Sequence, residues 1–248
     1  MSDKRTVIVT GAGGGLGSDM ARHFCEGGHA VACVGRPASG IHEVAEGLAA
    51  EGFACAAVEC DLADPAQIER MASETAERFG RIDVLVNNAA TYALRPWLEI
   101  EPEEFDRIVA VNQRGCFLTT KACFPWLKAS GTGRVVNIVS NTFFVGWDGL
   151  MSYVSSKGGI IGLTRTLARE IGREGVTVNA VAPGAIPTKA EEHHPNQDEF
   201  TRKILDFQAM KVRGTPGDIS RAVAYFADEG SGFVTGQTLI VDGGGAMI

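Results

Sequence analysis

Short apolar runs rich in Val and Ile alternate with amphipathic stretches along the whole sequence, and no other feature constrains the fold as much. The apolar runs predict strands at Thr6–Thr10, Ala30–Gly35, Ala54–Cys60, Val84–Asn87, Arg134–Ser140, Thr177–Ala182 and Thr238–Asp242. Helical patterns lie at Leu16–Glu26, His42–Ala50, Pro65–Phe79, Glu103–Lys128 with a break, Ser152–Glu174, Asp198–Met210 and Pro216–Ala227. Continuous apolar strands separated by helices predict an α/β fold: a doubly wound parallel sheet of seven strands with helices on both faces.

The composition favours one domain that handles small molecules. No linker, repeat or low-complexity tract divides the 248 residues, so we expect a single domain over residues 1–248. The net charge of −7, with no run of Lys or Arg, argues against a nucleic-acid or membrane surface. No apolar stretch approaches the roughly 18 residues of a membrane span, and the first strand begins close to the N-terminus, so we expect a cytoplasmic protein.

Neither the cysteines nor the histidines have the spacing of a metal site. The six cysteines include no C-x-x-C pair, and we expect them to be small buried side chains in a reducing compartment. His193 and His194 stand beside two glutamates in a polar loop, where adjacent residues rarely converge on one ion. No metal is therefore expected.

A glycine cluster follows the first predicted strand. Five glycines occupy the eight residues from Thr10 to Gly17. The G-x-G-x-x-G template does not fit, but Gly11, Gly15 and Gly17 are spaced G-x-x-x-G-x-G. Such a turn lets the pyrophosphate of a dinucleotide approach the first amides of the helix that begins near Leu16, where the helix dipole is positive. The other unusual residues also follow strands, so we expect the ligand site at the carboxyl edge of the sheet.

Five ordered motifs give the chain a family resemblance. They are the glycine turn, Asn87-Asn-Ala-Ala90, Ser140, Tyr153-Val-Ser-Ser-Lys157 and Asn179-Ala-Val-Ala-Pro-Gly184. Together they resemble the short-chain dehydrogenase/reductase family from Val7 to the Val241-Asp-Gly-Gly244 ending. The resemblance implies a Rossmann-type fold and an oxidoreductase that interconverts a secondary alcohol and a ketone with a nicotinamide dinucleotide.

The residue chemistry supports this activity. Tyr153 and Lys157 lie four residues apart on one helix face, so the ammonium can approach the phenol and is expected to lower its pKa. Tyr153 then exchanges a proton with the substrate oxygen, and Ser140 hydrogen-bonds the same oxygen. The resemblance implies that Lys157 also holds the nicotinamide ribose and that Asn112 anchors a water that conducts protons from Lys157.

The resemblance also implies contacts with the dinucleotide. Asp61 and Leu62 are expected at the adenine, Asn87 and Ala89 at the adenine ribose, and Pro183, Ile186 and Thr188 at the nicotinamide carboxamide. Asn88 is expected to stabilise the strand by hydrogen bonding. The end of the second strand reads Gly35-Arg36, with no carboxylate to repel a 2′-phosphate, so NADP(H) is favoured and NAD(H) stays possible.

The substrate is indicated less directly. Phe143, Phe144 and Trp147 lie between Ser140 and Tyr153 and are expected to contact an apolar, aromatic or cyclic substrate. Residues 189–213 have the composition of a substrate lid, whose polarity leaves open a 3-oxoacyl-carrier reductase. A further alternative is a catalytically silent NADP(H)-sensing protein. Apolar residues on several faces of two long helices, together with the family resemblance, predict a homotetramer; they are Cys116, Phe117, Ile160, Ile161, Leu163 and Leu167.

Overall fold

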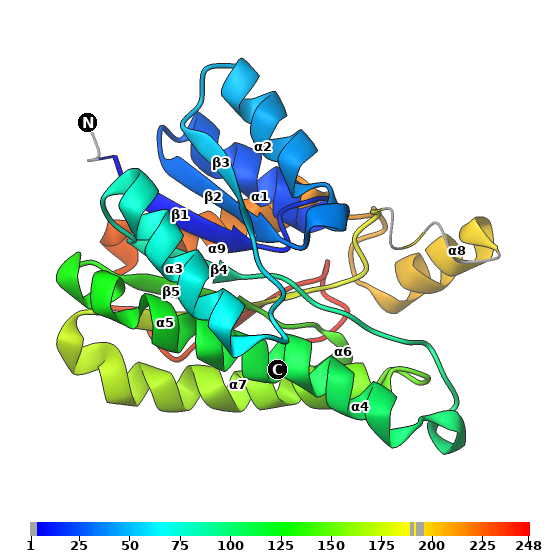
Figure 1. Cartoon of the computed structure of the whole chain (residues 1–248). Coiled ribbons are helices and arrows are strands. Elements are labelled where there is room, and N and C mark those ends of the chain that lie inside the picture. The colour runs from blue at the N-terminus through cyan, green and yellow to red at the C-terminus, as the bar shows by residue number, and fades with distance from the viewer. Residues whose placement is uncertain (1–3, 189–190, 192–195) are drawn as a thin grey trace.

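The computed structural model describes residues 4–188, 191 and 196–248, and these form a single parallel sheet with helices on both faces (Figure 1). The seven strands have the order β3-β2-β1-β4-β5-β6-β7, and the predicted seven-stranded parallel sheet is confirmed. Their bounds are β1 Thr6–Thr10, β2 Ala30–Gly35, β3 Cys55–Glu59, β4 Val84–Asn87, β5 Arg134–Ile138, β6 Thr177–Pro183 and β7 Thr238–Val241. Three strands match the prediction residue for residue, and the other four differ only at their ends.

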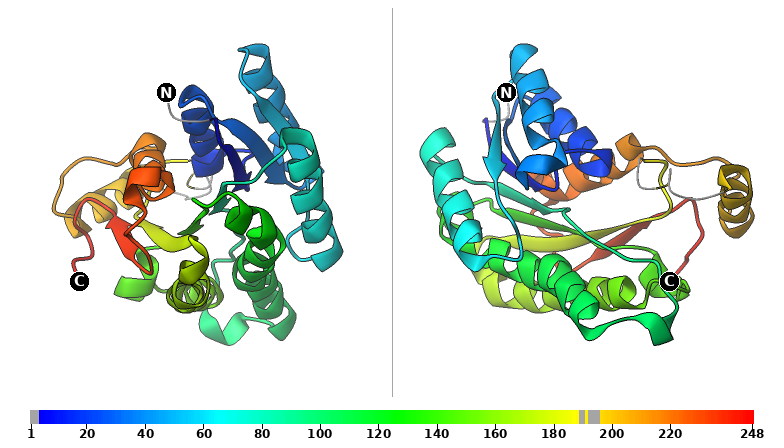
Figure 2. Two further views of the ribbon diagram at one scale, coloured as in Figure 1. Left: turned by 90° about the vertical axis from the view of Figure 1, so that its left-hand side faces the viewer. Right: turned by 45° about the vertical axis from the view of Figure 1, so that its right-hand side comes forward.

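Two helical layers cover the sheet. The helices are α1 Gly15–Glu26, α2 Ile41–Ala50, α3 Pro65–Phe79, α4 Pro102–Val109, α5 Gly115–Ala129, α6 Thr142–Val145, α7 Met151–Ile171, α8 Gln197–Phe207 and α9 Pro216–Ala227. Helices α1, α2 and α9 pack on one face, and α3, α5 and α7 pack on the other (Figure 2). Helix α8 projects away from these layers (Figure 2).

The strands are apolar on both faces because both faces are covered. In β1, Val7 and Val9 contribute to the core beneath α1 and α9, whereas Ile8 contributes to the core beneath α3 and α5. All three side chains are fully buried. Burial on both sides explains why the strand sequences are continuous apolar runs without alternating polar residues.

Local capping explains why two helices begin where the sequence predicts. The Asp64 carboxylate accepts hydrogen bonds from the amides of Ala66 and Gln67, and Pro65 occupies the first position of α3. Thr215 and Asp218 form a capping box at the start of α9, again with a proline in its first turn. These signals are local in sequence and therefore readable without the fold.

The predicted break in Glu103–Lys128 is a change of helical register. Helix α4 ends at Val109, a π-helical turn covers Ala110–Arg114, and α5 continues from Gly115. A π-helical turn inside a helix often marks a functional site, because the changed register alters which backbone groups are paired. Asn112 lies within this turn and is buried.

The six cysteines are free thiols, and all but the half-buried Cys55 are buried. No helix in the described part of the chain is both long and apolar enough to cross a bilayer. The lid predicted at residues 189–213 includes residues that lie outside the described ranges. His193 and His194 are among these residues.

Candidate active site

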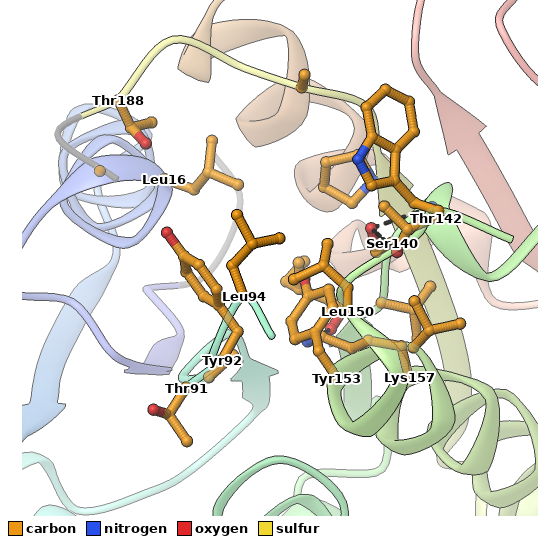
Figure 3. Close-up of a pocket in the computed structure, with 18 of the residues that line it drawn as sticks. Leu16, Thr91, Tyr92, Leu94, Ser140, Thr142, Leu150, Tyr153, Lys157 and Thr188 are labelled. Carbon is orange, nitrogen blue, oxygen red and sulfur yellow. Dashed lines mark hydrogen bonds between the residues drawn. The ribbon is translucent and has the colours of Figure 1, made fainter. Parts of the chain in front are cut away.

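One large cavity of about 1740 Å³ runs along the carboxyl edge of the sheet. Its walls include the glycine turn at one end and Trp147 and Phe207 at the other, with Ser140, Tyr153 and Lys157 between them. Figure 3 shows Tyr92 and Leu94 facing Leu150 and Tyr153 across this cavity. The sheet edge expected to carry the ligand site is thus the edge where the cavity lies.

Packing within the chain explains why two positions of the glycine turn, 11 and 17, carry no side chain. Gly11 has φ +67°, and a Cβ at this position would lie 2.8 Å from the Cα of Ala89. A Cβ at Gly17 would lie 2.1 Å from the carbonyl oxygen of Gly11. The Asn88 amide donates to the carbonyls of Thr10 and Gly11 at 2.9 and 3.2 Å, the stabilising role expected for it. Side chains are excluded at Gly11 and Gly17 because backbone occupies their space.

Gly14 differs, because it faces open space. Among the described residues, no atom beyond its chain neighbours lies within 4 Å of a Cβ built at Gly14, which has an extended φ of 171° and lines the cavity. It is the N-cap of α1, whose first turn contains no acidic residue and whose N-cap makes no side-chain hydrogen bond. This open cradle at a helix N-terminus fits the pyrophosphate of a dinucleotide. Gly15, Leu16 and Gly17 line the same cavity.

Helix α7 brings Tyr153 and Lys157 to the middle of the cavity. The Lys157 ammonium lies 5.4 Å from the centroid of the Tyr153 ring. Lys157 is only 2% exposed, and its ammonium donates to the carbonyl oxygen of Ile138 at 2.6 Å. Ser140 follows β5, and its hydroxyl accepts hydrogen bonds from the amide and hydroxyl of Thr142 at 3.2 and 2.8 Å. The three predicted residues therefore meet in the cavity, where Ser140 keeps its own proton for another acceptor (Figure 3).

Asn112 connects the loop after β4 to α7. Its side-chain oxygen accepts from the Thr91 amide, and its amide donates to the Thr91 carbonyl and the Ser156 hydroxyl. The Ser156 hydroxyl in turn donates to the carbonyl of Tyr153 at 2.7 Å. These bonds hold the helical turn that carries Tyr153. The predicted water at Asn112 stays a prediction.

Burial governs the ionisation of both α7 residues. It raises the pKa of Tyr153 to about 12, a shift that the hydrogen bond with Ser140 opposes. It also lowers the pKa of Lys157 to about 8. The sequence predicted a lowered pKa for this phenol, whereas its net pKa in the structure is raised, because desolvation of the phenolate is the largest effect on Tyr153 and outweighs the groups that favour the phenolate. At neutral pH the phenol keeps its proton and the amine is mostly charged.

This ionisation predicts how reduction of a ketone depends on pH. Since the pKa of Lys157 is about 8, raising the pH through that value removes the positive charge beside the phenol. We expect kcat for reduction to be flat from pH 6 to 7 and to fall about tenfold per pH unit well above the pKa of the amine. Initial rates at saturating substrate and dinucleotide measure this profile. A constant kcat up to pH 10 would contradict the role of the ammonium.

Most residues predicted to contact the dinucleotide line the cavity. Besides those of the glycine turn, they are Arg36, Asp61, Leu62, Ala89, Pro183, Ile186 and Thr188. Asn87 is the exception. Its side-chain amide donates to Asn137 and Thr120, and its oxygen accepts from the Thr119 hydroxyl. The Asn87 side chain is buried within this network and is absent from the cavity wall, and the predicted ribose contact of this residue stays a prediction.

At the end of β2, Gly35, which has little space for a side chain, is followed by the exposed Arg36. Arg36 is exposed at the cavity wall, and within the described ranges no side chain pairs with its guanidinium. A Cβ at Gly35 would lie 2.7 Å from the hydroxyl of Ser39. A carboxylate at position 35 would therefore require Ser39 to move.

The aromatic residues after Ser140 divide into two groups. Trp147 lines the cavity, as predicted. Phe143 and Phe144 do not: a Cβ at Gly158 would meet the Phe143 ring at 2.6 Å, and Phe144 packs against the core next to α7. The rings of Phe143 and Phe144 thus pack toward α7 in this structure, and their predicted substrate contacts stay predictions. Cavity residues that the sequence did not reveal include Leu94, Thr142, Leu150 and Lys203.

The predicted lid contributes one helix to the cavity wall. Phe200, Lys203, Ile204 and Phe207 of α8 line the cavity. The Lys203 ammonium lies 4.7 Å from the centroid of the Trp147 ring, and the Phe207 ring meets that ring edge-on. Whether α8 moves during turnover stays a prediction.

The fold and the site together define a class of protein, an α/β oxidoreductase of the dinucleotide-dependent kind. A family profile described as enoyl-(acyl carrier protein) reductase matches residues 11–245. The chain is 36% identical to BbsD of Thauera aromatica, a subunit of a hydroxy(phenyl)methyl-succinyl-CoA dehydrogenase, over 98% of this chain and 97% of that protein. It is 32% identical to the 3-oxoacyl acyl-carrier-protein reductase FabG of Staphylococcus aureus, over 98% and 99% of the two chains.

Two solved structures are similar over nearly their whole length. A putative short-chain alcohol dehydrogenase from Sinorhizobium meliloti has a TM-score of 0.92 and 29% identity, covering 97% of this chain and 96% of that one. A variant actinorhodin polyketide ketoreductase solved with NADPH has a TM-score of 0.92 and 31% identity, covering 99% and 98%. This chain belongs to the short-chain dehydrogenase/reductase family.

Proposed function

We propose that the protein is an NADP(H)-preferring oxidoreductase that interconverts a secondary alcohol and a ketone bearing an apolar or aromatic group. One observation carries the proposal: Ser140, Tyr153 and Lys157 meet in a cavity that also contains the open glycine cradle. The family relationship supports oxidoreductase activity.

The chain's own residues manage the proton and the substrate oxygen. A nicotinamide dinucleotide, when bound, supplies or accepts the hydride. In reduction, the protonated Tyr153 phenol donates its proton to the carbonyl oxygen as negative charge develops there. The Ser140 hydroxyl donates a hydrogen bond to the same oxygen. The charged Lys157 stabilises the tyrosinate that remains, and its bond to the Ile138 carbonyl fixes its position.

Apolar and aromatic side chains around Tyr153 support a bulky apolar substrate. Tyr92 lies edge-on to Tyr153, with ring centroids 6.0 Å apart. Leu94, Leu150 and Trp147 line the adjoining wall. The name of the BbsD relative combines a hydroxyl-bearing carbon, a phenyl ring and a CoA ester. A benzylic or similarly bulky alcohol is therefore the substrate that we favour.

A second candidate is reduction of a 3-oxoacyl group on a carrier. Two observations favour it: the FabG relatives over nearly the whole chain, and the cations Arg107 and Lys203 on the cavity wall, which suit an anionic carrier arm. A panel tests both candidates, with aryl ketones, cyclic ketones and 3-oxoacyl thioesters reduced by NADPH or NADH. Tight NADPH binding without oxidation by any of them would favour the catalytically silent alternative.

The preference for NADP(H) is proposed to depend on Arg36. Replacement of Arg36 by Ala should lower the ratio of kcat/KM for NADPH to kcat/KM for NADH by about tenfold, because the guanidinium that pairs with the 2′-phosphate is lost. Steady-state kinetics with both dinucleotides measure the ratio. Arg173→Ala is the matched control, since Arg173 is 83% exposed and lies outside the cavity wall. An unchanged ratio in Arg36→Ala would refute this role.

We propose that the chain acts as a single domain and assembles with copies of itself. Of the apolar residues expected between subunits, Cys116, Ile160 and Ile161 are instead buried within the chain's own core. The exposed apolar side chains that support self-association are Phe117, Tyr225, Phe233 and Leu239. A homotetramer remains the proposed form.

A further inference from the structure

The carboxyl ends of β5, β6 and β7 are tied together next to Ser140. The amide of Asn141 donates to the Pro183 carbonyl at 3.0 Å, and its side chain donates to the Asp242 carboxylate at 3.0 Å. The amide of Gly184 donates to the Val241 carbonyl at the same distance. Asn141 and Asp242 are 8% and 9% exposed. The residue that follows Ser140 is thus bonded directly to the end of the last strand.

The Asp242 carboxylate also organises the C-terminal turn. One oxygen accepts from the amides of Gly244 and Gly245, both at 3.0 Å, and the other accepts from the amide of Ala246 at 2.8 Å. Gly243 and Gly244 have φ values of +68° and +78°, which let the chain wrap around the carboxylate. A charged acceptor with four donors is a strong local anchor.

The same turn holds the end of α8. The amides of Ala209 and Met210 donate to the carbonyls of Gly244 and Gly243 at 3.3 and 2.9 Å. A Cβ at Gly245 would lie 2.4 Å from the Phe207 ring, so the turn packs directly on the last residue of the helix. The C-terminal turn and the end of α8 therefore form one packed unit.

Helix α8 faces the substrate side of the cavity. Its Phe207 ring meets Trp147 at a centroid distance of 6.3 Å and an interplanar angle of 87°. Near α8, Arg213 supplies a further tie, donating to the Ala185 carbonyl and to Glu191. A continuous path of contacts leads from Asn141 through Asp242 and the C-terminal turn to Phe207.

We propose that Asp242 is a positioning residue for the substrate. Through Asn141 and the C-terminal turn, its carboxylate holds α8 in place relative to Ser140, and so sets the affinity for the substrate without setting the affinity for the dinucleotide. The expected change in KM rests on the proposed function, because it requires turnover. The placement of α8 relative to Ser140 does not, because it can be measured without turnover.

The kinetic test uses Asp242→Asn, with NADPH as dinucleotide and the best carbonyl from the panel. The amide nitrogen cannot accept hydrogen bonds, so one side of the anchor loses its acceptor. We expect KM for the carbonyl to rise about tenfold, with kcat and the Kd for NADPH changed by less than about threefold. Asp228→Asn is the matched control: Asp228 caps the Gly230 amide at 2.7 Å outside the cavity wall, and its loss should leave KM unchanged.

Hydrogen exchange supplies the readout that is independent of activity. Without substrate, the amides of α8 should exchange about tenfold faster in Asp242→Asn, whereas those of β1 and α1 should exchange at the wild-type rate. Asn141→Ala, which removes one bond of the anchor, should show a smaller change of the same kind and serves if Asp242→Asn does not fold. Unchanged exchange in α8, or an equal acceleration throughout the chain, would overturn the proposal. A wild-type protein without turnover would refute the proposed function alone.

Discussion

Replacing Tyr153 by Phe should lower kcat by about 10³-fold while the affinity for NADPH stays within about twofold of the wild type. The phenol is the group that can donate a proton to the substrate oxygen, because burial keeps it protonated with a pKa of about 12. The substitution keeps the aromatic ring, which packs edge-on against Tyr92. Steady-state kinetics with the best carbonyl and fluorescence titration with NADPH measure the two quantities.

Tyr225→Phe is the matched control for this experiment. Tyr225 lies on α9, is 52% exposed and is outside the cavity wall, so loss of its hydroxyl should not change kcat. If Tyr153→Phe kept more than about a tenth of the wild-type kcat, another group or water would be donating the proton. A parallel loss of NADPH affinity would instead indicate that the substitution disturbs the dinucleotide site.

The second large effect is expected for Gly14→Val. The structure predicts that the chain itself tolerates this side chain, because φ is extended and no atom in the described part of the chain, apart from the neighbouring residues, lies within 4 Å of the Cβ. The isopropyl group would occupy the space in which we place the pyrophosphate. The Kd for NADPH should therefore rise at least about 100-fold, which corresponds to about 2.7 kcal/mol. The loss of an N-cap glycine should cost about 1 kcal/mol of stability, a shift of only a few degrees in Tm.

Two other glycine substitutions separate affinity from folding. Gly47→Val places the same side chain on the exposed face of α2, where a Cβ also meets no atom, and should leave NADPH binding unchanged. Gly17→Ala should mainly lower Tm, because its Cβ would collide with the backbone of Gly11. Wild-type affinity in Gly14→Val would show that the dinucleotide does not approach the N-terminus of α1.

Local signals account for the parts of the fold that the sequence predicted well. The predicted starts of α3 and α9 coincide with Asp64-Pro65 and with the capping box of Thr215, and both signals act within one turn of helix. The apolar runs predicted the strands because a sheet covered on both faces needs apolar side chains on both faces. The predictions for β3 and β5 were longer than the strands observed, since a strand ends where pairing with its neighbour ends.

The candidate site was predicted where its residues are close in sequence. Tyr153 and Lys157 are one helical turn apart, so their shared helix face follows from helix geometry. The fates of Asn87, Phe143 and Phe144 could not be predicted this way, because each depends on a neighbour distant in the chain, such as Asn137 for Asn87 and Gly158 for Phe143.

Periodicity and short spacing were enough to predict the strands and helices, the family and the Tyr153–Lys157 pair. The folded chain was needed to show which side chains face the cavity, the pKa of Tyr153 and the hydrogen bonds of Asp242. These depend on burial and on contacts between segments as distant as Asn141 and Asp242. Desolvation and hydrogen bonding act through space, so they are known only once the chain is folded.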